Sequence, residues 1–440
     1  MNDYDEIMKR LYARRSHGIR PGLDAEKALL EVFDNPERSF GVIHVAGTNG
    51  KGSVCALLAG ILQAMGFRTG LYTSPHLIRF GERIRVDDRE LSEDDIVDLT
   101  RYMEDRVAVV EEELGRGITF FEMATAMAFE HFRNRQVNIA VIETGMGGRL
   151  DATNVVEPLI SAITPVSIEH ALYLGNSIEK IAGEKAGIIK PGAPVVYRRM
   201  DAAAETVIRK KAEEAGVNCV CVEDVSSTDI VSREGFGQKV RIETGNRSPG
   251  VMNLPLAGEF QAGNLACAVV VVDQLERVLD ITIPDKVLKV GVEQSRWQGR
   301  FEILAESPPV ALDGAHNPSA SAALRKAIVA RYGKAPVFMV LGMCDDKDAG
   351  GFLRQWKGSI ARIWCVDVPN ERSMDNSALA AIAREKGYDA LTSGLDKAFA
   401  DAVAGANAQA GVVCICGSLF LSGWVIENRD RLFPLSRGEV

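Results

Sequence analysis

The sequence predicts an α/β fold with two sheet-based domains, and three observations lead to this prediction. Short β-branched runs such as GVIHVAG, VNIAVIET and PLISAITPV alternate with helical patterns in the N-terminal part of the chain. A second alternating series, with the runs PPVALDG, APVFMVLG, RIWCVDV and GVVCICG, begins near Phe301. The 440 residues suffice for two or three domains of about 150 residues each. Such alternation is typical of a mostly parallel sheet covered by helices.

The segment EQSRWQGRFE joins the two series, and a domain boundary is expected within it. The predicted domains are residues 1–296 and residues 297–440. The polar, glycine-bearing stretch from Val220 to Gly250 carries short alternations, so it is expected to be a β-rich excursion of the first domain. Helical periodicity is expected over 54–65, 121–132 and 178–186.

The composition is that of a globular protein, with 46% hydrophobic residues, 25% charged residues and a net charge of −9. An acidic chain without basic runs is a poor candidate for binding nucleic acid or an anionic membrane surface. The longest apolar run, Leu265–Val272, is too short to span a bilayer. The N-terminal sequence MNDYDEIMKRLYARR lacks the apolar core of a secretion signal.

The 8 cysteines do not have the spacing of a disulfide framework or of a zinc site. Cys219 with Cys221, and Cys414 with Cys416, lie two residues apart in apolar runs, so each pair is expected on one face of a strand. Buried, reduced thiols are the favoured interpretation, and they suit a cytoplasmic protein.

The segment VIHVAGTNGKGSVCALLAGIL predicts a strand, a glycine-rich loop and a helix, which is the context of a phosphate-binding loop. Glycines allow backbone N–H groups to face phosphate oxygens, Lys51 supplies a positive charge, and Ser53 can offer its hydroxyl to Mg²⁺. The pattern departs from the common G-x-x-x-x-G-K-[ST], because Val45 stands at the first glycine position and Gly52 follows the lysine. A nucleotide site is preferred over a plain structural turn.

Glu143 and His170 each follow a predicted buried strand. Ligands of open parallel sheets bind beyond the carboxyl ends of the strands, where the phosphate loop also lies. Taken singly, Glu143 could be a capping or surface carboxylate and His170 a turn histidine. Together with the loop, they favour a Mg²⁺ environment, more strongly for Glu143 because histidine is an unusual ligand of Mg²⁺.

Lys185 falls on the apolar face of the helix predicted over 178–186, whereas Lys180 falls on the polar face. Ser177 offers a helix start and Gly187 a helix end. Lys185 could be a lysine favoured by the helix dipole, with its ammonium extended to solvent. A buried ammonium would instead be costly unless it is paired or neutral, which indicates a functional role.

In the second series, PPVALDGAHNPSASAALRKAI predicts a strand, a polar loop and a helix. Asp313, His316 and Asn317 are clustered at the strand end, and Pro318 opens the helix. A structural turn and a ligand site both account for this cluster.

The motifs HVAGTNGKGSV, LYTSPHL, ERIRV, FFEMATAMAF, ETGMGGRLDATN, GEKAGIIKPG, WQGRFE and LDGAHNP occur in this order. Together they resemble the folylpolyglutamate synthase/dihydrofolate synthase family, a branch of the Mur ligase superfamily. The resemblance extends from about Ser16 to Gly423. It implies an α/β fold in which a P-loop ATPase domain is followed by a smaller Rossmann-like C-terminal glutamate-ligase domain, with the active site between them.

The resemblance also implies site residues. The ATP phosphate loop would comprise Gly47, Thr48, Asn49, Gly50, Lys51, Gly52 and Ser53. Other ATP contacts would come from Asn264, Arg300 and Asp313. Two Mg²⁺ ions would be held by Ser53, Ser74, Glu143 and His170. The incoming glutamate would be bound near His316 and Ser418, and His316 is the candidate general base. The pterin pocket would be lined by Thr119, Phe121, Asp151 and Ala152.

In this family the lysine of the EKAG motif is implied to react with CO₂. Lys185 would then carry a carbamate that supports the second Mg²⁺. Three segments depart from the family pattern: IRPGLD from Ile19, Phe260-Gln261 in GEFQAGN, and Glu169-His170-Ala171. These departures concern substrate preference more than ATP chemistry.

The implied reaction is ATP-dependent ligation of L-glutamate to a pterin or folate acid through an acyl phosphate. The acceptor could be dihydropteroate, reduced folates, both, or an acid outside folate metabolism. A kinase or simple NTPase, a Mur ligase acting on a UDP-sugar peptide, and a non-catalytic nucleotide-binding module are the alternatives. A cytoplasmic monomer is expected.

Overall fold

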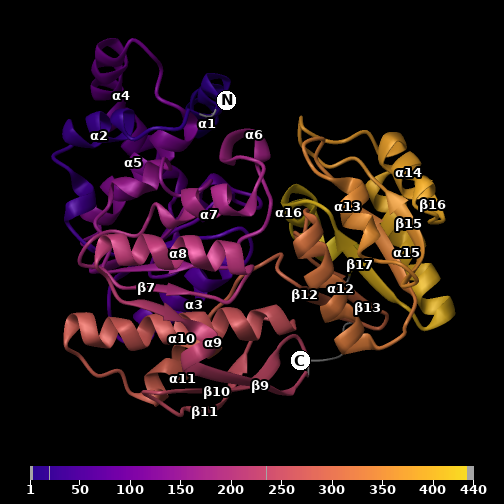
Figure 1. Cartoon of the computed structure of the whole chain (residues 1–440). Coiled ribbons are helices and arrows are strands. Elements are labelled where there is room, and N and C mark those ends of the chain that lie inside the picture. Colours follow the sequence, from indigo (N-terminus) through magenta and orange to yellow (C-terminus); the bar gives the residue numbers. More distant parts are fainter. Residues whose placement is uncertain (1–2, 19, 234, 434–440) are drawn as a thin grey trace. The chain divides into compact units, whose positions relative to one another are not determined.

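The N-terminal part of the chain forms an eight-stranded sheet with the strand order β4-β3-β2-β5-β1-β6-β7-β8 (Figure 1). The computed structural model describes residues 3–18, 20–233 and 235–433. Strands β2 and β5 to β8 run parallel to β1, whereas β3 and β4 are added as antiparallel strands at one edge. The strands are β1 (Gly41–Ala46), β2 (Thr69–Tyr72), β3 (Ile84–Val86), β4 (Arg89–Glu90), β5 (Ile139–Glu143), β6 (Ile160–Ile163), β7 (Val195–Tyr197) and β8 (Cys219–Cys221).

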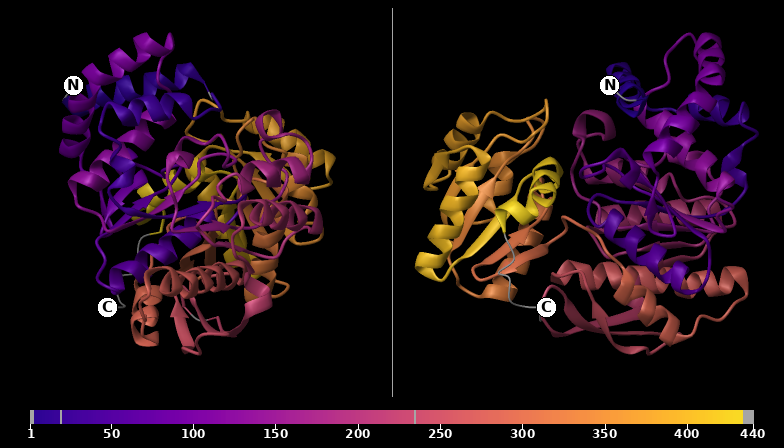
Figure 2. Two further views of the ribbon diagram at one scale, coloured as in Figure 1. Left: turned by 60° about the vertical axis from the view of Figure 1, so that its left-hand side comes forward. Right: turned by 180° about the vertical axis from the view of Figure 1, so that it is seen from behind.

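Helices cover both faces of this sheet, so nearly every residue of its central strands β5, β1 and β6 is buried. Helices α7 and α8 lie on the face that is in front in Figure 1, and α3 lies in front in the reverse view of Figure 2. The helices are α1 (Asp3–Ala13), α2 (Asp24–Glu31), α3 (Lys51–Ala64), α4 (Glu93–Leu114), α5 (Phe120–Asn134), α6 (Ala171–Leu174), α7 (Ile178–Ala186), α8 (Ala202–Ala215) and α9 (Val222–Val225). Short 3₁₀ turns are η1 (Arg14–His17), η2 (Pro36–Arg38), η3 (Phe80–Arg83) and η4 (Ala152–Val155).

A three-stranded sheet with the order β11-β10-β9 follows, together with two helices. Its presence confirms that the stretch after Val220 is rich in β-structure. The elements are β9 (Ser226–Ser232), β10 (Gln238–Thr244), β11 (Gly250–Leu254), α10 (Glu259–Leu279) and α11 (Asp285–Gln294).

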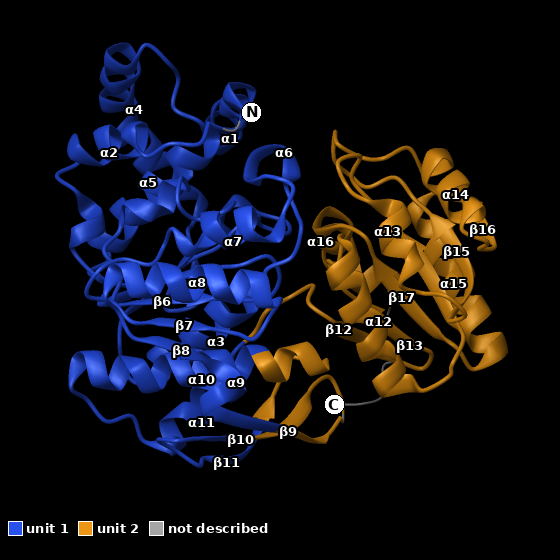
Figure 3. Ribbon diagram, viewed as in Figure 1, with its two compact units in different colours: residues 1–228, 242–252, 264–295 blue, residues 229–241, 253–263, 296–440 orange. Residues whose placement is uncertain are grey.

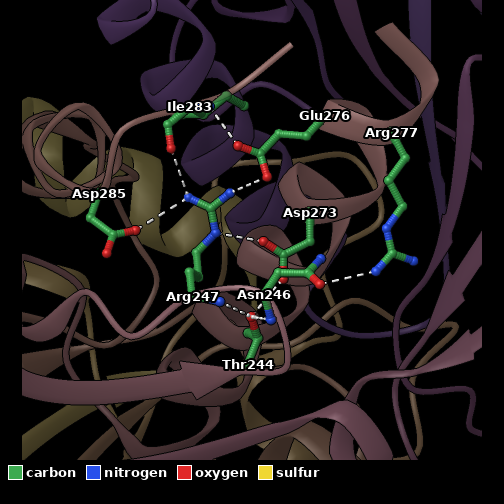
Figure 4. A network of polar contacts seen from close by, with 8 residues as sticks. All are labelled: Thr244, Asn246, Arg247, Asp273, Glu276, Arg277, Ile283 and Asp285. Carbon is green, nitrogen blue, oxygen red and sulfur yellow. Dashed lines mark hydrogen bonds and ion pairs between the residues drawn. The ribbon is translucent and has the colours of Figure 1, made fainter. Parts of the chain in front are cut away.

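The side chain of Arg247 connects the turn between β10 and β11 to α10 and to the segment before α11 (Figure 4). Its side chain is only 5% exposed and donates to Asp273 Oδ1 at 2.5 Å and to Glu276 Oε2 at 2.6 Å. It also donates to the backbone oxygen of Ile283 at 3.1 Å. Because the guanidinium is matched by carboxylates and a carbonyl, its burial is compensated.

The C-terminal part forms a six-stranded sheet with the order β12-β13-β17-β14-β15-β16, parallel except for β12. The strands are β12 (Glu302–Glu306), β13 (Pro309–Leu312), β14 (Val337–Leu341), β15 (Ile360–Cys365), β16 (Ala390–Thr392) and β17 (Val412–Cys416). The helices are α12 (Pro318–Tyr332), α13 (Ala349–Arg354), α14 (Asn376–Glu385), α15 (Leu395–Gln409), α16 (Leu419–Glu427) and α17 (Arg429–Leu432).

Both faces of this second sheet are buried, as β14 illustrates. Met339 packs in one apolar cluster with residues of α12 to α14, and Val340 packs in another with residues of α15 and α16. Cys414 and Cys416 of β17 lie in the first of these clusters, which confirms that they share a face. The α/β fold class and the second alternating series are thereby confirmed.

The described residues group into two compact units (Figure 3). One comprises residues 1–228, 242–252 and 264–295, and the other comprises 229–241, 253–263 and 296–440. The division into domains 1–296 and 297–440 stays a prediction. No helix in the described part of the chain has the length and apolarity of a membrane span.

The predicted helices agree well with the observed ones. Helix α7 has the predicted bounds, with Ser177 as its N-terminal cap and Gly187 at its C-terminal end. Helix α3 starts at Lys51, earlier than its apolar periodicity indicates, because its first turn contains the residues Lys51, Gly52 and Ser53, which contribute no large apolar side chain. Lys185 is 1% exposed and Lys180 is exposed, which confirms the two predicted faces of α7.

Candidate active site

The candidate phosphate loop follows β1 and begins at Gly47, whose φ of 146° favours glycine. A Cβ atom at this position would lie 1.8 Å from Thr164 Oγ1, so the loop passes the residue that follows β6 at a distance that only glycine allows. Gly50, with φ of 95°, ends the loop, and α3 begins at Lys51. The backbone N–H groups at the start of a helix lack intrahelical partners and suit an anion such as phosphate.

Lys51 and Glu143 lie together at this loop. Lys51 Nζ donates to the backbone oxygens of Gly47 and Thr48 at 3.1 and 3.3 Å, and it lies 3.9 Å from Glu143 Oε1. Glu143 is the last residue of β5, the strand beside β1. The backbone N–H of Ser74, which follows β2, donates to Glu143 Oε2 at 3.2 Å. Three strand ends thus bring a lysine and a carboxylate to one edge of the sheet, as the sequence predicts.

Asn264 also reaches the loop, from α10. Its side chain is buried, at 3% exposure. A Cβ atom at Gly50 would lie 2.7 Å from Asn264 Oδ1, so the amide packs directly against the loop glycine. The structure therefore places Asn264 beside the residues that the sequence assigns to the phosphates.

Lys185 points from α7 into the same loop. Its Nζ donates to the backbone oxygen of Gly47 at 2.7 Å and to Glu169 Oε1 at 2.8 Å. Glu169 lies in the segment between β6 and α6, and its side chain is 13% exposed. A buried ammonium is tolerated here because a carbonyl and a carboxylate accept its protons.

The two partners shift each other's titration in the direction expected of a buried ion pair. Burial lowers the pKa of Lys185 to about 8, while the Glu169 carboxylate raises it in part. Burial raises the pKa of Glu169, but Lys185 and then Lys51 outweigh this effect and lower it to about 2. Lys185 is therefore far closer to neutrality at pH 7 to 8 than an exposed lysine.

The residues expected to hold Mg²⁺ have the right donor chemistry. Ser53 is buried in the first turn of α3, and Glu143 accepts the N–H of Ser74 as described. His170 is exposed, with φ of 47°, and follows Glu169 in the chain. Among residues 3–18, 20–233 and 235–433, no cluster of three or more His, Cys, Asp or Glu side chains has the arrangement of a metal site. Of the four expected ligands, only Glu143 and His170 are of these residue types. The serine hydroxyls and the Glu143 carboxylate are hard oxygen donors, which suit Mg²⁺.

The residues expected on the pterin side also have structural roles. Thr119 caps α5, and its Oγ1 accepts a backbone N–H of the first turn. Asp151 accepts a backbone N–H of the glycine-rich segment after β5 at 2.8 Å and caps the turn that begins at Ala152. The ring of Phe121 packs against Gly145 of the same segment. Phe121 and Asp151 therefore lie at the glycine-rich segment that begins directly after Glu143.

In the C-terminal unit, the expected residues gather at the ends of β13 and β17. Asp313 accepts two backbone N–H groups at 2.7 Å; burial raises its pKa to about 6, although Arg300 lowers it in part. His316 Nδ1 lies 2.8 Å from the backbone oxygen of Gly314. Ser418 caps α16, and a backbone hydrogen bond joins its loop to the loop that carries His316.

Comparison with known proteins identifies the family. The Mur ligase middle domain model matches residues 45–272, and the Mur ligase glutamate ligase domain model matches residues 299–419. A dihydrofolate synthase/folylpolyglutamate synthase of Bacillus subtilis (strain 168) is 35% identical over 355 residues, which are 80% of this chain and 82% of that protein. The chain belongs to the folylpolyglutamate synthase/dihydrofolate synthase family.

Solved structures agree with this membership. The folylpolyglutamate synthase of Mycobacterium tuberculosis, complexed with ADP and AMPPCP, has a TM-score of 0.88 at 30% identity. The match covers 97% of this chain and 99% of that protein. A folylpolyglutamate synthase complex with AMPPCP and folate has a TM-score of 0.82 at 28% identity, with 97% and 99% coverage. As a member of the family, the chain is an ATP-dependent ligase that joins glutamate to folates.

One departure from the family pattern has a structural role that the sequence does not reveal. Glu169 stands where the family often has aspartate, and its carboxylate is the partner of Lys185. A second departure, Phe260, packs edge-to-face on Phe301 at 6.3 Å between ring centroids. Of the segment IRPGLD, Ile19 lies outside the described residues, whereas Arg20 Nε donates to the backbone oxygen of His17 at 3.1 Å.

Proposed function

We propose that the chain activates the carboxylate of a pterin-type acid with ATP and joins it to the amine of L-glutamate at the carboxyl edge of β1 and β5. The observation that carries this proposal is the convergence of Lys51, Glu143 and Lys185 on the loop that begins at Gly47. The acceptors are dihydropteroate, reduced folates or both, which agrees with the relatives described as dihydrofolate synthase/folylpolyglutamate synthase.

The chemistry shows why such a site is needed. A carboxylate is a poor electrophile, and its oxygen cannot leave as oxide. Transfer of the γ-phosphoryl group of ATP to the carboxylate gives ADP and an acyl phosphate, whose phosphate can leave. The glutamate amine then attacks the acyl carbon, and a tetrahedral intermediate releases phosphate to give the amide. The main obstacle is the repulsion between the carboxylate and the polyphosphate, which nearby positive charge offsets.

The proposal assigns the nucleotide to the loop and its neighbours. The residues from Gly47 to Ser53, which form the loop and the first turn of α3, would hold the phosphates with their backbone N–H groups, and Lys51 would neutralise charge on the transferred group. Asn264, which packs on Gly50, would complete this side of the site. Arg300 and Asp313 are proposed as ATP contacts of the C-terminal domain, residues 297–440.

Two Mg²⁺ ions are proposed at the same edge. Ser53, Ser74 and Glu143 would offer oxygen donors to the first ion, and Glu143 and His170 would offer donors to the second. When bound, the ions would supply positive charge to the phosphate oxygens. Lys51 already lies 3.9 Å from Glu143, so this lysine would share the carboxylate with the metal or turn toward the phosphates.

Lys185 is proposed to carry a carbamate. Its neutral amine would add to CO₂ with loss of a proton, which replaces the ammonium by an anion with two hard oxygens. Two features support the proposal: burial lowers the pKa of Lys185 to about 8, and its Nζ lies at the loop rather than in solvent. The pair with Glu169 would have to open, because two adjacent carboxylates repel each other. Intact-protein and peptide mass spectra after methyl trapping in bicarbonate should show the modification on Lys185 and none on the exposed Lys180.

The remaining roles are assigned by proposal. Thr119, Phe121, Asp151 and Ala152 would line the acceptor pocket beside the glycine-rich segment after β5. His316 and Ser418 would bind glutamate, and His316 is proposed as the base that accepts the amine proton. A monomer in the cytoplasm is proposed, and the 8 cysteines, all of them free thiols, are in keeping with this location.

The function is tested with purified protein, ATP, Mg²⁺ and glutamate, to which dihydropteroate and a reduced folate are offered separately. ADP release should require both glutamate and an acid acceptor, and mass spectrometry should show the glutamylated product. ADP release that is indifferent to glutamate would indicate a kinase or simple NTPase. Lys51→Ala should abolish turnover, whereas Lys180→Ala, at an exposed position of α7, should leave it unchanged.

A further inference from the structure

Arg83 is a buried arginine that forms no ion pair with a carboxylate of the described residues. It ends the 3₁₀ turn η3, in the ERIRV motif, and is only 6% exposed. Within the described part of the chain it forms no ion pair, and its one side-chain hydrogen bond runs from Nε to His76 Nδ1 at 2.8 Å. The terminal N–H groups of its guanidinium are therefore left for another acceptor.

An unmatched buried guanidinium is costly, because arginine cannot lose its proton at physiological pH and must be removed from water as a cation. Arg247 shows how the same fold treats a structural arginine: two carboxylates and a carbonyl accept its protons. Arg83 has no such set among the residues that the structure describes. Charges of this kind, held without a counter-ion, are typical of binding sites for anions.

The orientation of Arg83 is fixed from one side. Because Arg83 Nε donates to His76 Nδ1, that ring nitrogen is the acceptor, and the ring's Nε2 faces Tyr12 Oη at 3.4 Å. The backbone oxygen of Arg83 accepts the N–H of Thr73 at 3.0 Å. The guanidinium is thus preorganised, with its planar fork still available for a bidentate anion.

A second arginine lies close by. The guanidinium carbon of Arg83 is 5.2 Å from the ring centroid of Phe120, and that of Arg15 is 5.1 Å from the same ring. Arg15 also covers the ring of Tyr12 at 4.2 Å, and the rings of Tyr12 and Phe120 are stacked at 5.5 Å. This cluster therefore combines two cations with two aromatic rings, a chemistry that suits an anion attached to an aromatic group.

The cluster of Arg83, Arg15, Tyr12 and Phe120 is connected along the chain to the sheet edge that carries Glu143. Thr73, which holds the backbone of Arg83, precedes Ser74, whose N–H donates to Glu143. Phe120 lies between two residues that the proposed function assigns to the acceptor, namely Thr119 and Phe121. The phosphates already have their own cation in Lys51, so a second cationic pair on the acceptor side is available for the other anion of the reaction.

We propose that Arg83, with help from Arg15, binds the carboxylate of the acid acceptor and holds it for phosphoryl transfer. His76 acts as a positioning residue, because it orients the guanidinium through Nε without touching the substrate. The proposal rests on the proposed function and adds the group that recognises the acid. A guanidinium that donates to both carboxylate oxygens also distinguishes an aromatic acid from an otherwise identical neutral molecule.

The test is a binding cycle with two ligands, pteroate and its analogue that lacks the carboxylate, measured by titration calorimetry. Wild-type protein should bind pteroate about 10- to 100-fold more tightly than the analogue, as for a hydrogen-bonded charge pair. Arg83→Gln should lose most of this preference while it binds the analogue as wild type does. Arg85→Gln is the matched control, because Arg85 is paired with Asp88 and Glu90 and should keep the preference.

Each outcome decides the proposal. A wild-type preference that persists in Arg83→Gln overturns it, as does a loss of ATP affinity in that variant with pteroate binding unchanged, which would assign Arg83 to the phosphates. Wild-type protein that binds no pterin acid at all refutes the proposed function and the inference with it. If Arg83→Gln fails to fold, Arg15→Gln, at an exposed position, should lower the preference several-fold, and an unchanged preference contradicts the proposal.

Discussion

Replacing Glu26 with methionine is expected to stabilise the protein, by an amount that grows with pH. Glu26 lies in α2 and is 0% exposed, and neither of its carboxyl oxygens has a hydrogen-bond partner among the described residues. Burial raises the pKa of Glu26 well above 4.5, and the carboxylates of Glu122 and Asp151 raise it further. The folded protein therefore keeps a proton on Glu26 that the unfolded chain releases.

The magnitude follows from this difference in proton binding. Above pH 4.5 the unfolded state binds one proton fewer at Glu26 than the folded state. The free energy of unfolding then falls by about 1.4 kcal/mol per pH unit for as long as the folded carboxyl stays protonated. Each pH unit over which the folded carboxyl keeps its proton therefore adds about 1.4 kcal/mol to the advantage of the variant. Methionine removes this loss and also the buried acceptor without a partner, which costs about 1–3 kcal/mol at any pH.

The assay is urea unfolding of wild-type and Glu26→Met protein at several pH values, followed by far-UV circular dichroism. The difference in the free energy of unfolding between the two proteins, taken at each pH, separates the contribution of Glu26 from those of the other titrating groups. The four tryptophans lie at positions 297, 356, 364 and 424, so tryptophan fluorescence reports the C-terminal unit and serves as an internal reference. Hydrogen exchange of α2 and α5, measured by mass spectrometry, locates the effect.

Glu31→Met is the matched control, because Glu31 is exposed at the end of the same helix. It should change the free energy of unfolding by no more than about 0.5 kcal/mol, and equally at each pH. A stability difference for Glu26→Met that does not grow between pH 5 and pH 6.5 would refute the reasoning. So would a destabilised variant whose hydrogen exchange rises in α2, since it would mean that the carboxyl is satisfied in solution.

Three further substitutions are expected to have measurable effects. Gly47→Ala should abolish ATP binding in calorimetry, because its Cβ atom would overlap Thr164 Oγ1 and displace the loop; nucleotide binding at wild-type strength would contradict the geometry. Arg247→Ala should lower the free energy of unfolding by about 3–5 kcal/mol in urea titrations, since it leaves the buried Asp273 carboxylate without its cationic partner, and a loss below about 1 kcal/mol would contradict this. Burial, and to a smaller extent Lys190, lowers the pKa of His44 to about 3, so below pH 6.5 the unfolded chain binds a proton at His44 that the folded protein does not. The free energy of unfolding should therefore fall by about 1.4 kcal/mol for each pH unit below 6.5. His44→Asn should remove this acid sensitivity, and an unchanged pH profile would argue against it.

Much of the candidate site can be predicted from the sequence because its signals are local. The phosphate loop is contiguous, and a strand, glycines, Lys51 and a helix follow one another in the order that a phosphate-binding loop requires. Glu143 is predictable because parallel strands bring their ends to one edge. The burial of Lys185 is predictable from the helical period alone.

The pairs that give these residues their properties could not be predicted, because they join distant parts of the chain. The partner of Lys185 is Glu169, which lies in an irregular segment without periodicity, so no spacing rule connects the two. Glu26 has the sequence context of an ordinary charged helix residue, and only the packing of α2 in the fold shows that it is buried. Arg83 likewise stands beside paired charges in ERIRV, and only the folded chain shows that it forms no ion pair with a carboxylate of the described residues.

The central claim is that this edge of the sheet transfers a phosphoryl group from ATP to the acceptor's carboxylate before the amide forms. The most direct test uses an acceptor whose carboxylate is labelled with ¹⁸O, together with ATP, Mg²⁺ and glutamate. The acyl-phosphate route predicts that each phosphate released carries one ¹⁸O atom from the acceptor, in equal amount to the amide product. Phosphate without ¹⁸O, formed while glutamylated product accumulates, would contradict the account.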